Sequence, residues 1–278
     1  MASNLVSSPS GAAAGVSGST GSKHTRSGPR ARFTAAAAHL LISIAMAAGV
    51  LGVVYFGWYP KPLDALSGVG EILLMLLAID VTLGPMLTFI IFDRRKKSLT
   101  FDLSCIAVMQ IAAMAYGLHV VEAGRPHYIV FVKDRFELVS RADLRQEDRA
   151  GAMGNRAAEV DWLAPRIVAA QMPESAQERR DLMFESVAGG RDAQHFPKRY
   201  RDYATHAAQA ATKGTPLADL RLLNPDRSDL LQAAVARSRR VEDGLRFLPI
   251  KGPQRDASML LDASTGAIVG MVDLQPWR

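Results

Sequence analysis

One carboxylic acid, Asp80, lies in the middle of an apolar stretch that is long enough to cross a lipid bilayer. A charged side chain at that depth costs about 2.5–3.5 kcal/mol on insertion scales, so a buried acid needs hydrogen-bond partners or a functional role. At a helical rise of ~1.5 Å per residue, Ser43 and Tyr116 on two other apolar stretches lie at nearly the same depth. We therefore expect Ser43 and Tyr116 to be the hydrogen-bond partners of Asp80.

Two further polar side chains lie nearer the cytoplasmic boundary of the same region. His39 and Gln110 come out at about 9–10 Å from the inner boundary of the bilayer, counted at the helical rise per residue. That depth matches the level of Thr88 better than the level of Asp80.

Pro85 follows the acid in the same stretch and removes the backbone donor that the carbonyl of Val81 would use, which predicts a kink. A kink beside a buried acid is common in transporters. However, no second acid lies at the depth of Asp80, and three spans are few for a pore. The pattern therefore favours an acid that holds a helix bundle together or contacts a partner helix, with Asp80, Pro85, Ser43 and Tyr116 as the candidate contact residues. An ion-coupled transport subunit that uses Asp80 is the alternative.

Three apolar runs must position these side chains: Phe33–Tyr59, Val69–Phe92 and Leu103–Ala123. Each approaches or exceeds the ~20 residues that a helix needs to span the hydrocarbon core. We therefore expect a three-helix transmembrane region over residues 33–123. Residues 1–32 begin with a stretch rich in Ser, Gly and Ala that lacks the apolar content to order itself, so this segment is expected to be disordered.

Basic residues flank the apolar runs unevenly. Arg30 and Arg32 precede the first run, and Arg94 to Lys97 separate the second from the third. The positive-inside rule then places the N-terminus in the cytoplasm. Because the number of spans is odd, we expect a multi-pass protein of the bacterial inner membrane with residues 124–278 in the periplasm. A signal peptide cleaved after Ala47 is the alternative, but the apolar run continues to Phe56 and favours an uncleaved anchor.

Residues 124–278 have the composition of a water-soluble domain. They hold 24 of the 33 Lys and Arg and 21 of the 27 Asp and Glu, an excess of only three positive charges. This balance argues against nucleic-acid binding in spite of the pI of about 9.6. Because Cys105 is the single cysteine, a disulfide within the chain and a cysteine-based metal site are both excluded.

The pattern of the soluble half predicts an α+β domain with an antiparallel sheet. Residues 128–139 are typical of two strands around a turn at Lys133–Arg135, residues 245–251 of a strand, and residues 258–274 of a hairpin. Helices are expected at 173–187, at 199–212 and from Asp226, as its N-cap, to about Glu242. The expected fold is three transmembrane helices followed by this C-terminal extracytoplasmic domain.

Catalytic patterns are absent from the sequence: it contains no nucleophile elbow, P-loop, HExxH or kinase set. His195 and His206 are spaced too loosely for a metal pair. We therefore expect no enzyme activity, no cofactor and no metal. Arg125, Asp134 and Arg135 could form a charged cluster at the first hairpin and are the candidate periplasmic contacts.

The order and spacing of several short motifs over residues 32–278 resembles the TfpX/TfpZ family of type IV pilin accessory proteins. The matching stretches are His39-Leu-Leu-Ile-Ser43, Trp58-Tyr-Pro60, Asp80-Val-Thr-Leu-Gly-Pro85, Phe101-Asp-Leu103, Ala115-Tyr-Gly117, Arg125-Pro-His-Tyr128, Phe131-Val-Lys-Asp-Arg-Phe-Glu137, Phe247-Leu-Pro249, Asp262-Ala-Ser-Thr-Gly266 and Leu274-Gln-Pro-Trp277.

The resemblance implies an inner-membrane accessory or chaperone protein that supports pilin stability, pilus assembly or pilus dynamics. Its partners would be the bilayer, a major or minor type IV pilin and other pilus assembly proteins. A membrane-anchored sensor with an extracytoplasmic ligand domain is a second alternative, disfavoured because only a tail and a short basic loop would face the cytoplasm.

Overall fold

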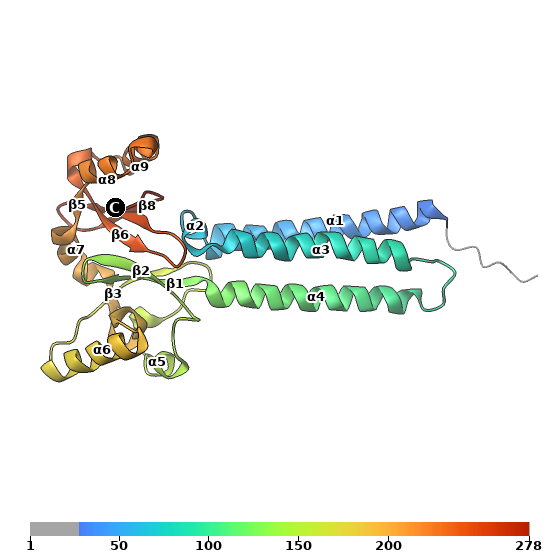
Figure 1. Cartoon of the computed structure of the whole chain (residues 1–278), viewed down its shortest axis with the longest axis horizontal. Helices are drawn as coiled ribbons and strands as arrows, with labels where there is room; N and C mark the ends of the chain where they lie inside the picture. Colours follow the sequence, from blue (N-terminus) through green and yellow to red (C-terminus); the bar gives the residue numbers. More distant parts are fainter. Residues whose placement is uncertain (1–27, 278) are drawn as a thin grey trace, which may run out of the picture.

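The computed structural model describes residues 28–277 and shows an elongated molecule, with three long helices at one end and an α+β domain at the other (Figure 1). Residues 1–27 of the segment expected to be disordered lie outside the described residues, whereas Pro29–Arg32 form the first turn of a helix, so the expectation of disorder is wrong there. The helices are α1 (Pro29–Val53), which continues as a π-helical turn over Val54–Trp58, α3 (Val69–Ile91) and α4 (Leu99–Gly124). All three are long and apolar enough to cross a membrane, as predicted.

The boundaries of these helices follow from local sequence. Pro29 stands in the first turn of α1, where its missing N–H is not needed. Gly68, with a φ of +68°, ends the short α2 (Leu63–Ser67) in the left-handed conformation that glycine tolerates and lets α3 begin at once. Pro85 lies inside α3 without ending it, so the predicted kink does not break the helix.

The core of the three-helix bundle is apolar near the α+β domain and contains buried polar side chains farther from it. Both α1 and α4 pack along α3. Next to the domain, apolar side chains of all three helices form one buried cluster that includes Val54, Leu73 and Val121. The buried polar residues Ser43, Asp80 and Thr88 lie farther from the domain. Hydrophobic packing therefore fixes one half of the bundle, and hydrogen bonds must fix the other.

The α+β domain is built on one mixed, curled sheet with the strand order β4-β3-β1-β2-β6-β7-β8, and β5 pairs with β6. Its hairpins are antiparallel as predicted, but β1 pairs with β3 and β2 pairs with β6 in parallel, so the expectation of an antiparallel sheet is only partly right. The strands are β1 (Pro126–Val132), β2 (Arg135–Ser140), β3 (Arg166–Ala170), β4 (Tyr200–Asp202), β5 (Thr215–Pro216), β6 (Leu245–Lys251), β7 (Ala257–Asp262) and β8 (Ile268–Val272).

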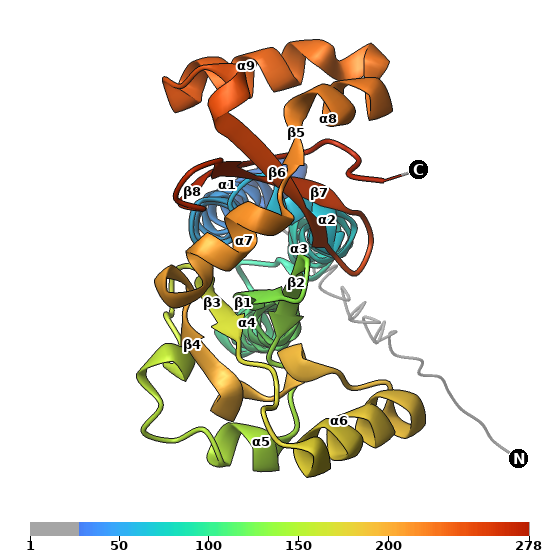
Figure 2. The same ribbon diagram turned by 90° about the vertical axis from the view of Figure 1, so that its left-hand side faces the viewer.

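Five shorter helices lie around this sheet, with α8 and α9 at one end and α5 and α6 at the other (Figure 2). The helix predicted at 173–187 is confirmed as α6, and Ser175 caps its first turn through a hydrogen bond from the Glu178 N–H. The five helices are α5 (Gln146–Ala150), α6 (Ala176–Gly189), α7 (Ala207–Lys213), α8 (Leu217–Leu223) and α9 (Ser228–Ser238).

Two helix predictions need correction. Residues 199–212 form β4, a 3₁₀ turn and α7 rather than one helix, because β3 pairs with residues 200–202 and draws them into the sheet. Asp226 does not cap α9: the helix begins at Ser228, and no side chain caps it.

Strand β1 is the centre of the domain and is buried along its whole length. Its β-branched and aromatic side chains alternate between two cores, as the period of two in a strand requires. Ile129 and Phe131 face a core that also contains Leu63 and Leu66 from α2, whereas Tyr128 and Val130 face the core around Tyr200. The connection between the first two long helices therefore packs inside the α+β domain.

Candidate functional site

Asp80 accepts a hydrogen bond from Gln110 on α4. The distance from Gln110 Nε2 to Asp80 Oδ1 is 3.0 Å, and the same nitrogen lies 3.2 Å from the Asp80 carbonyl oxygen. The expectation that Gln110 matches the level of Thr88 better than that of Asp80 is therefore wrong. The expected partners do not engage either: the Tyr116 side chain is 71% exposed on the outside of the bundle, and the buried Ser43 hydroxyl makes no hydrogen bond.

Gly84 explains how Gln110 reaches the acid. It stands one turn after Asp80 on the same face of α3, and a Cβ placed there would lie 2.2 Å from Gln110 Nε2. Glycine thus opens a notch in α3 that the Gln110 amide fills. By contrast, the predicted level of His39 is confirmed: its Nδ1 lies 2.6 Å from Thr88 Oγ1.

Gly84→Ala is expected to displace the Gln110 amide and to destabilise the bundle by about 1–3 kcal/mol, the usual cost of overpacking together with a lost interhelical hydrogen bond. The measurement is thermal unfolding of the full chain in detergent. Gly49→Ala is the matched control, because a Cβ at Gly49 meets nothing within 4 Å. Equal destabilisation by the two substitutions would contradict the notch.

Small residues on the long helices serve two different purposes. Gly117 on α4 packs against the Leu76 side chain, 2.5 Å from where its Cβ would lie, so it closes the bundle from within. Gly49 and Gly52 on α1 have no neighbour within 4 Å of such a Cβ. Together with Ala45 and Ala48 they form an outward-facing strip, which we call the α1 small-residue face.

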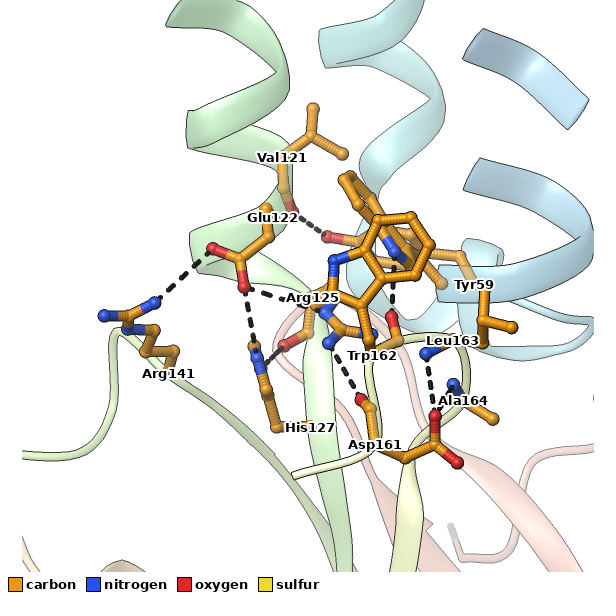
Figure 3. A network of polar contacts seen from close by, with 11 residues as sticks. Tyr59, Val121, Glu122, Arg125, His127, Arg141, Asp161, Trp162, Leu163 and Ala164 are labelled. Carbon is orange, nitrogen blue, oxygen red and sulfur yellow. Dashed lines mark hydrogen bonds and ion pairs between the residues drawn. The ribbon is translucent and has the colours of Figure 1, made fainter. Parts of the chain in front are cut away.

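A second polar cluster joins the bundle to the α+β domain at the end of α4 (Figure 3). At its centre the Arg125 side chain is only 1% exposed, and its Nη2 donates to the Asp161 carbonyl at 2.9 Å. The guanidinium also lies over the Trp58 ring, 5.5 Å from the ring centroid. Burial lowers the pKa of Arg125 below its usual value.

Aromatic side chains at the end of α1 complete this junction. The Tyr59 hydroxyl donates to the Val121 carbonyl at 2.8 Å (Figure 3). Trp58 Nε1 donates to the Trp162 carbonyl at 3.1 Å. The Trp58 and Trp162 rings meet edge to face with centroids 6.0 Å apart. The carboxyl ends of the first long helix and of α4 and the loop before β3 are therefore held together at this junction.

Glu122 is the acidic partner within the junction. Its Oε1 lies 3.3 Å from His127 Nε2 and 3.9 Å from Arg125 Nε, while Arg141 approaches its other oxygen at 4.0 Å. Burial and the neighbouring Arg125 charge lower the pKa of His127 below its usual value. Glu122 is thus shared by Arg125, His127 and Arg141, and the charge of Asp161 also acts on Arg125.

The predicted hairpin cluster is not formed as expected. Arg125 precedes β1, whereas Asp134 and Arg135 lie at the turn beyond the opposite end of that strand. The expectation that Arg125 joins them is therefore wrong. Arg135 Nε lies 2.9 Å from Asp134 Oδ1, and its guanidinium stacks over Trp277 at 5.8 Å. Among residues 28–277, no group of three or more His, Cys, Asp and Glu side chains could hold a metal ion.

Comparison with known proteins gives a consistent result. Residues 28–68 match the family described as Fimbrial assembly protein FimB. Two fimbrial assembly proteins of Dichelobacter nodosus, from serogroups I and E1, are 27% and 26% identical over 215 residues, which cover 76% of this chain and 83% of each relative. A third, from serogroups C1 and C2, is 34% identical over 108 residues, 38% of this chain and 82% of that relative.

The chain belongs to the fimbrial assembly protein family. The family match covers α1, the π-helical turn and α2, which are the first long helix and the segment that enters the domain core. No solved structure matches this fimbrial assembly protein.

Sequence reasoning missed several residues of these sites. Gln110 was assigned to the wrong neighbour because depth along a helix says nothing about the direction in which a side chain points. Trp162 carried no motif, and no local pattern marks it, because it reaches the end of the first long helix only in the folded chain. Gly84 stood within the quoted motif Asp80-Val-Thr-Leu-Gly-Pro85, where its four-residue spacing from Asp80 could have indicated a notch beside the acid.

Proposed function

We propose that this fimbrial assembly protein is a non-enzymatic accessory or chaperone protein of a type IV pilus in the bacterial inner membrane. The carrying observation is its membership of the fimbrial assembly family, in a chain with three helices of membrane-spanning length and composition. In this proposal the N-terminus is cytoplasmic, because the basic residues Arg94 and Arg95 lie in the connection between α3 and α4, at the same end of the bundle as the start of α1 (Figure 1). The α+β domain is then periplasmic.

The proposed partner is a pilin, engaged through its apolar helix while it waits in the membrane. The α1 small-residue face supports this proposal, because small residues let two helix backbones approach closely in a bilayer. Gly49 and Gly52 have room for such an approach, since a Cβ at either position would meet nothing within 4 Å. The Asp80–Gln110 hydrogen bond lies inside the bundle and holds α3 against α4.

The test is photo-crosslinking in living cells from single positions of the full chain. A photoreactive residue at position 49 is expected to yield an adduct with a pilin. The matched control is position 109 on a different helix, α4, where Met109 is 72% exposed. Equal adducts from both positions would contradict a specific docking face. Normal piliation in a strain that lacks the protein would overturn the proposed function itself.

A further inference from the structure

A cavity of about 450 Å³ opens beside the carboxyl end of α4, where the bundle meets the α+β domain. Three arginines contribute to its wall: Arg125 at the start of β1, Arg141 after β2 and Arg149 on α5. Its two carboxylates are Glu122 and Glu159. The rest of the wall is largely apolar, so the cavity combines an excess of positive charge with an apolar lining.

Two of these arginines have donors that the chain does not use. Nε and Nη1 of Arg125 are buried without a hydrogen-bond partner, and so is Nε of Arg149. Within residues 28–277, no carboxylate forms an ion pair with Arg149. Glu122 is already engaged with His127, Arg125 and Arg141. Unpaired buried donors are costly, so their presence beside a cavity indicates an anionic group that is received there.

The position of the cavity identifies the source of that anion. The loop over residues 159–164, which forms part of the cavity rim, is pinned to the end of the first long helix by the Trp58–Trp162 hydrogen bond. On this loop Val160, Trp162 and Leu163 are 53%, 62% and 54% exposed. Exposed apolar and tryptophan side chains at the end of a membrane-spanning helix lie at the level of the lipid headgroups.

We infer that this cavity binds the headgroup phosphate of an anionic phospholipid, with Arg125, Arg141 and Arg149 facing the phosphate and the 159–164 loop resting in the bilayer surface. The planar guanidinium groups suit a phosphate, to which they can donate two hydrogen bonds each. The acyl chains would leave the cavity past Trp162 and Leu163 into the same leaflet. This lipid site is independent of pilin binding through α1.

The test is native mass spectrometry of the full chain released from nanodiscs that contain phosphatidylglycerol and phosphatidylcholine. The unaltered protein is expected to retain phosphatidylglycerol in preference to phosphatidylcholine. The double variant Arg141→Gln, Arg149→Gln is expected to lose about tenfold in phosphatidylglycerol affinity, since it removes two of the three cations. Both side chains are outside the hydrophobic cores, so the variant keeps the fold, which circular dichroism checks.

Arg145→Gln is the matched control, because Arg145 is an exposed arginine near α5 that pairs with Glu147 and does not line the cavity. Equal phosphatidylglycerol retention by the double variant and this control would overturn the inference, as would equal retention of the two lipids by the unaltered chain. A final arm adds inorganic phosphate: if it displaces phosphatidylglycerol at millimolar concentration, the site takes a free anion and the lipid assignment is wrong.

Discussion

Arg125→Ala is expected to destabilise the full chain by about 2–4 kcal/mol, because it deletes a buried charged hydrogen bond and leaves a hole under an aromatic ring. The guanidinium donates a hydrogen bond to the Asp161 carbonyl and makes a cation–π contact with the Trp58 ring. Its loss also leaves Glu122, only 21% exposed, with fewer cations around it. We expect the loop over residues 159–164 to detach from the end of α1, since Trp58 and Arg125 fasten it from two sides.

The measurement is thermal unfolding in detergent together with limited proteolysis, which should cut the freed loop. Arg141→Ala is the control, because its side chain is 55% exposed and approaches Glu122 only at 4.0 Å. An exposed pair of this kind contributes about 0–1 kcal/mol. If both variants unfold alike and the 159–164 loop stays protected from protease, the junction does not depend on Arg125.

Gly266→Ala is expected to be the most damaging single-methyl change in the α+β domain, at about 3 kcal/mol or more. Gly266 has a φ of +70°, a conformation that costs other residues about 1–2 kcal/mol. A Cβ there would also lie 1.8 Å from the backbone oxygen of Ala207 at the start of α7. Overpacking against backbone adds about 1–3 kcal/mol.

The turn around Gly266 is held too firmly to move aside. The Asp262 carboxylate accepts hydrogen bonds from the backbone N–H and hydroxyl groups of Ser264 and Thr265, at 2.6–3.0 Å, and these donors hold the pKa of Asp262 well below its usual range. The Tyr203 hydroxyl donates to the Gly266 carbonyl at 2.7 Å, and burial raises the pKa of Tyr203 to about 12.

Gly190→Ala separates the two contributions to this prediction. Gly190 has a similar φ of +64°, but a Cβ there meets nothing within 4 Å. We therefore expect only the conformational cost of about 1 kcal/mol at that position. Chemical unfolding of the full chain, followed by near-ultraviolet circular dichroism, measures both variants. Equal losses would show that Ala207 yields to the added methyl group.

The elements that sequence predicted best are those with a local signal. Short apolar runs and the Asp262-Ala-Ser-Thr-Gly266 turn predicted β6, β7 and β8 within a residue or two, because apolar patterning and turn chemistry are short-range properties. The parallel pairings were missed because β3 is a five-residue strand after Pro165, far from β1 in the chain. Nothing local marks a partner that distant.

The intramembrane site shows a similar division. Depth follows from the rise per residue, and it placed His39 at the level of Thr88 correctly. Rotation about the helix axis depends on how the helices pack, and it turned Tyr116 outward and brought Gln110 to Asp80 through the notch at Gly84. The unused donors at the junction were also beyond prediction, since they depend on three segments that meet only in the folded chain.

The packing of α2 has a consequence for how the gene can be rearranged. Leu63 and Leu66 are fully buried among side chains of β1, β6 and β7, and the Leu66 carbonyl accepts a hydrogen bond from the Gln254 N–H at 3.0 Å. The segment between the first two long helices is thus made early in translation but finds its place only when the last strands emerge. The three-helix bundle and the α+β domain are therefore not independently exchangeable. A recombination event that replaced one of them would also have to supply residues in the other that match the packing of α2.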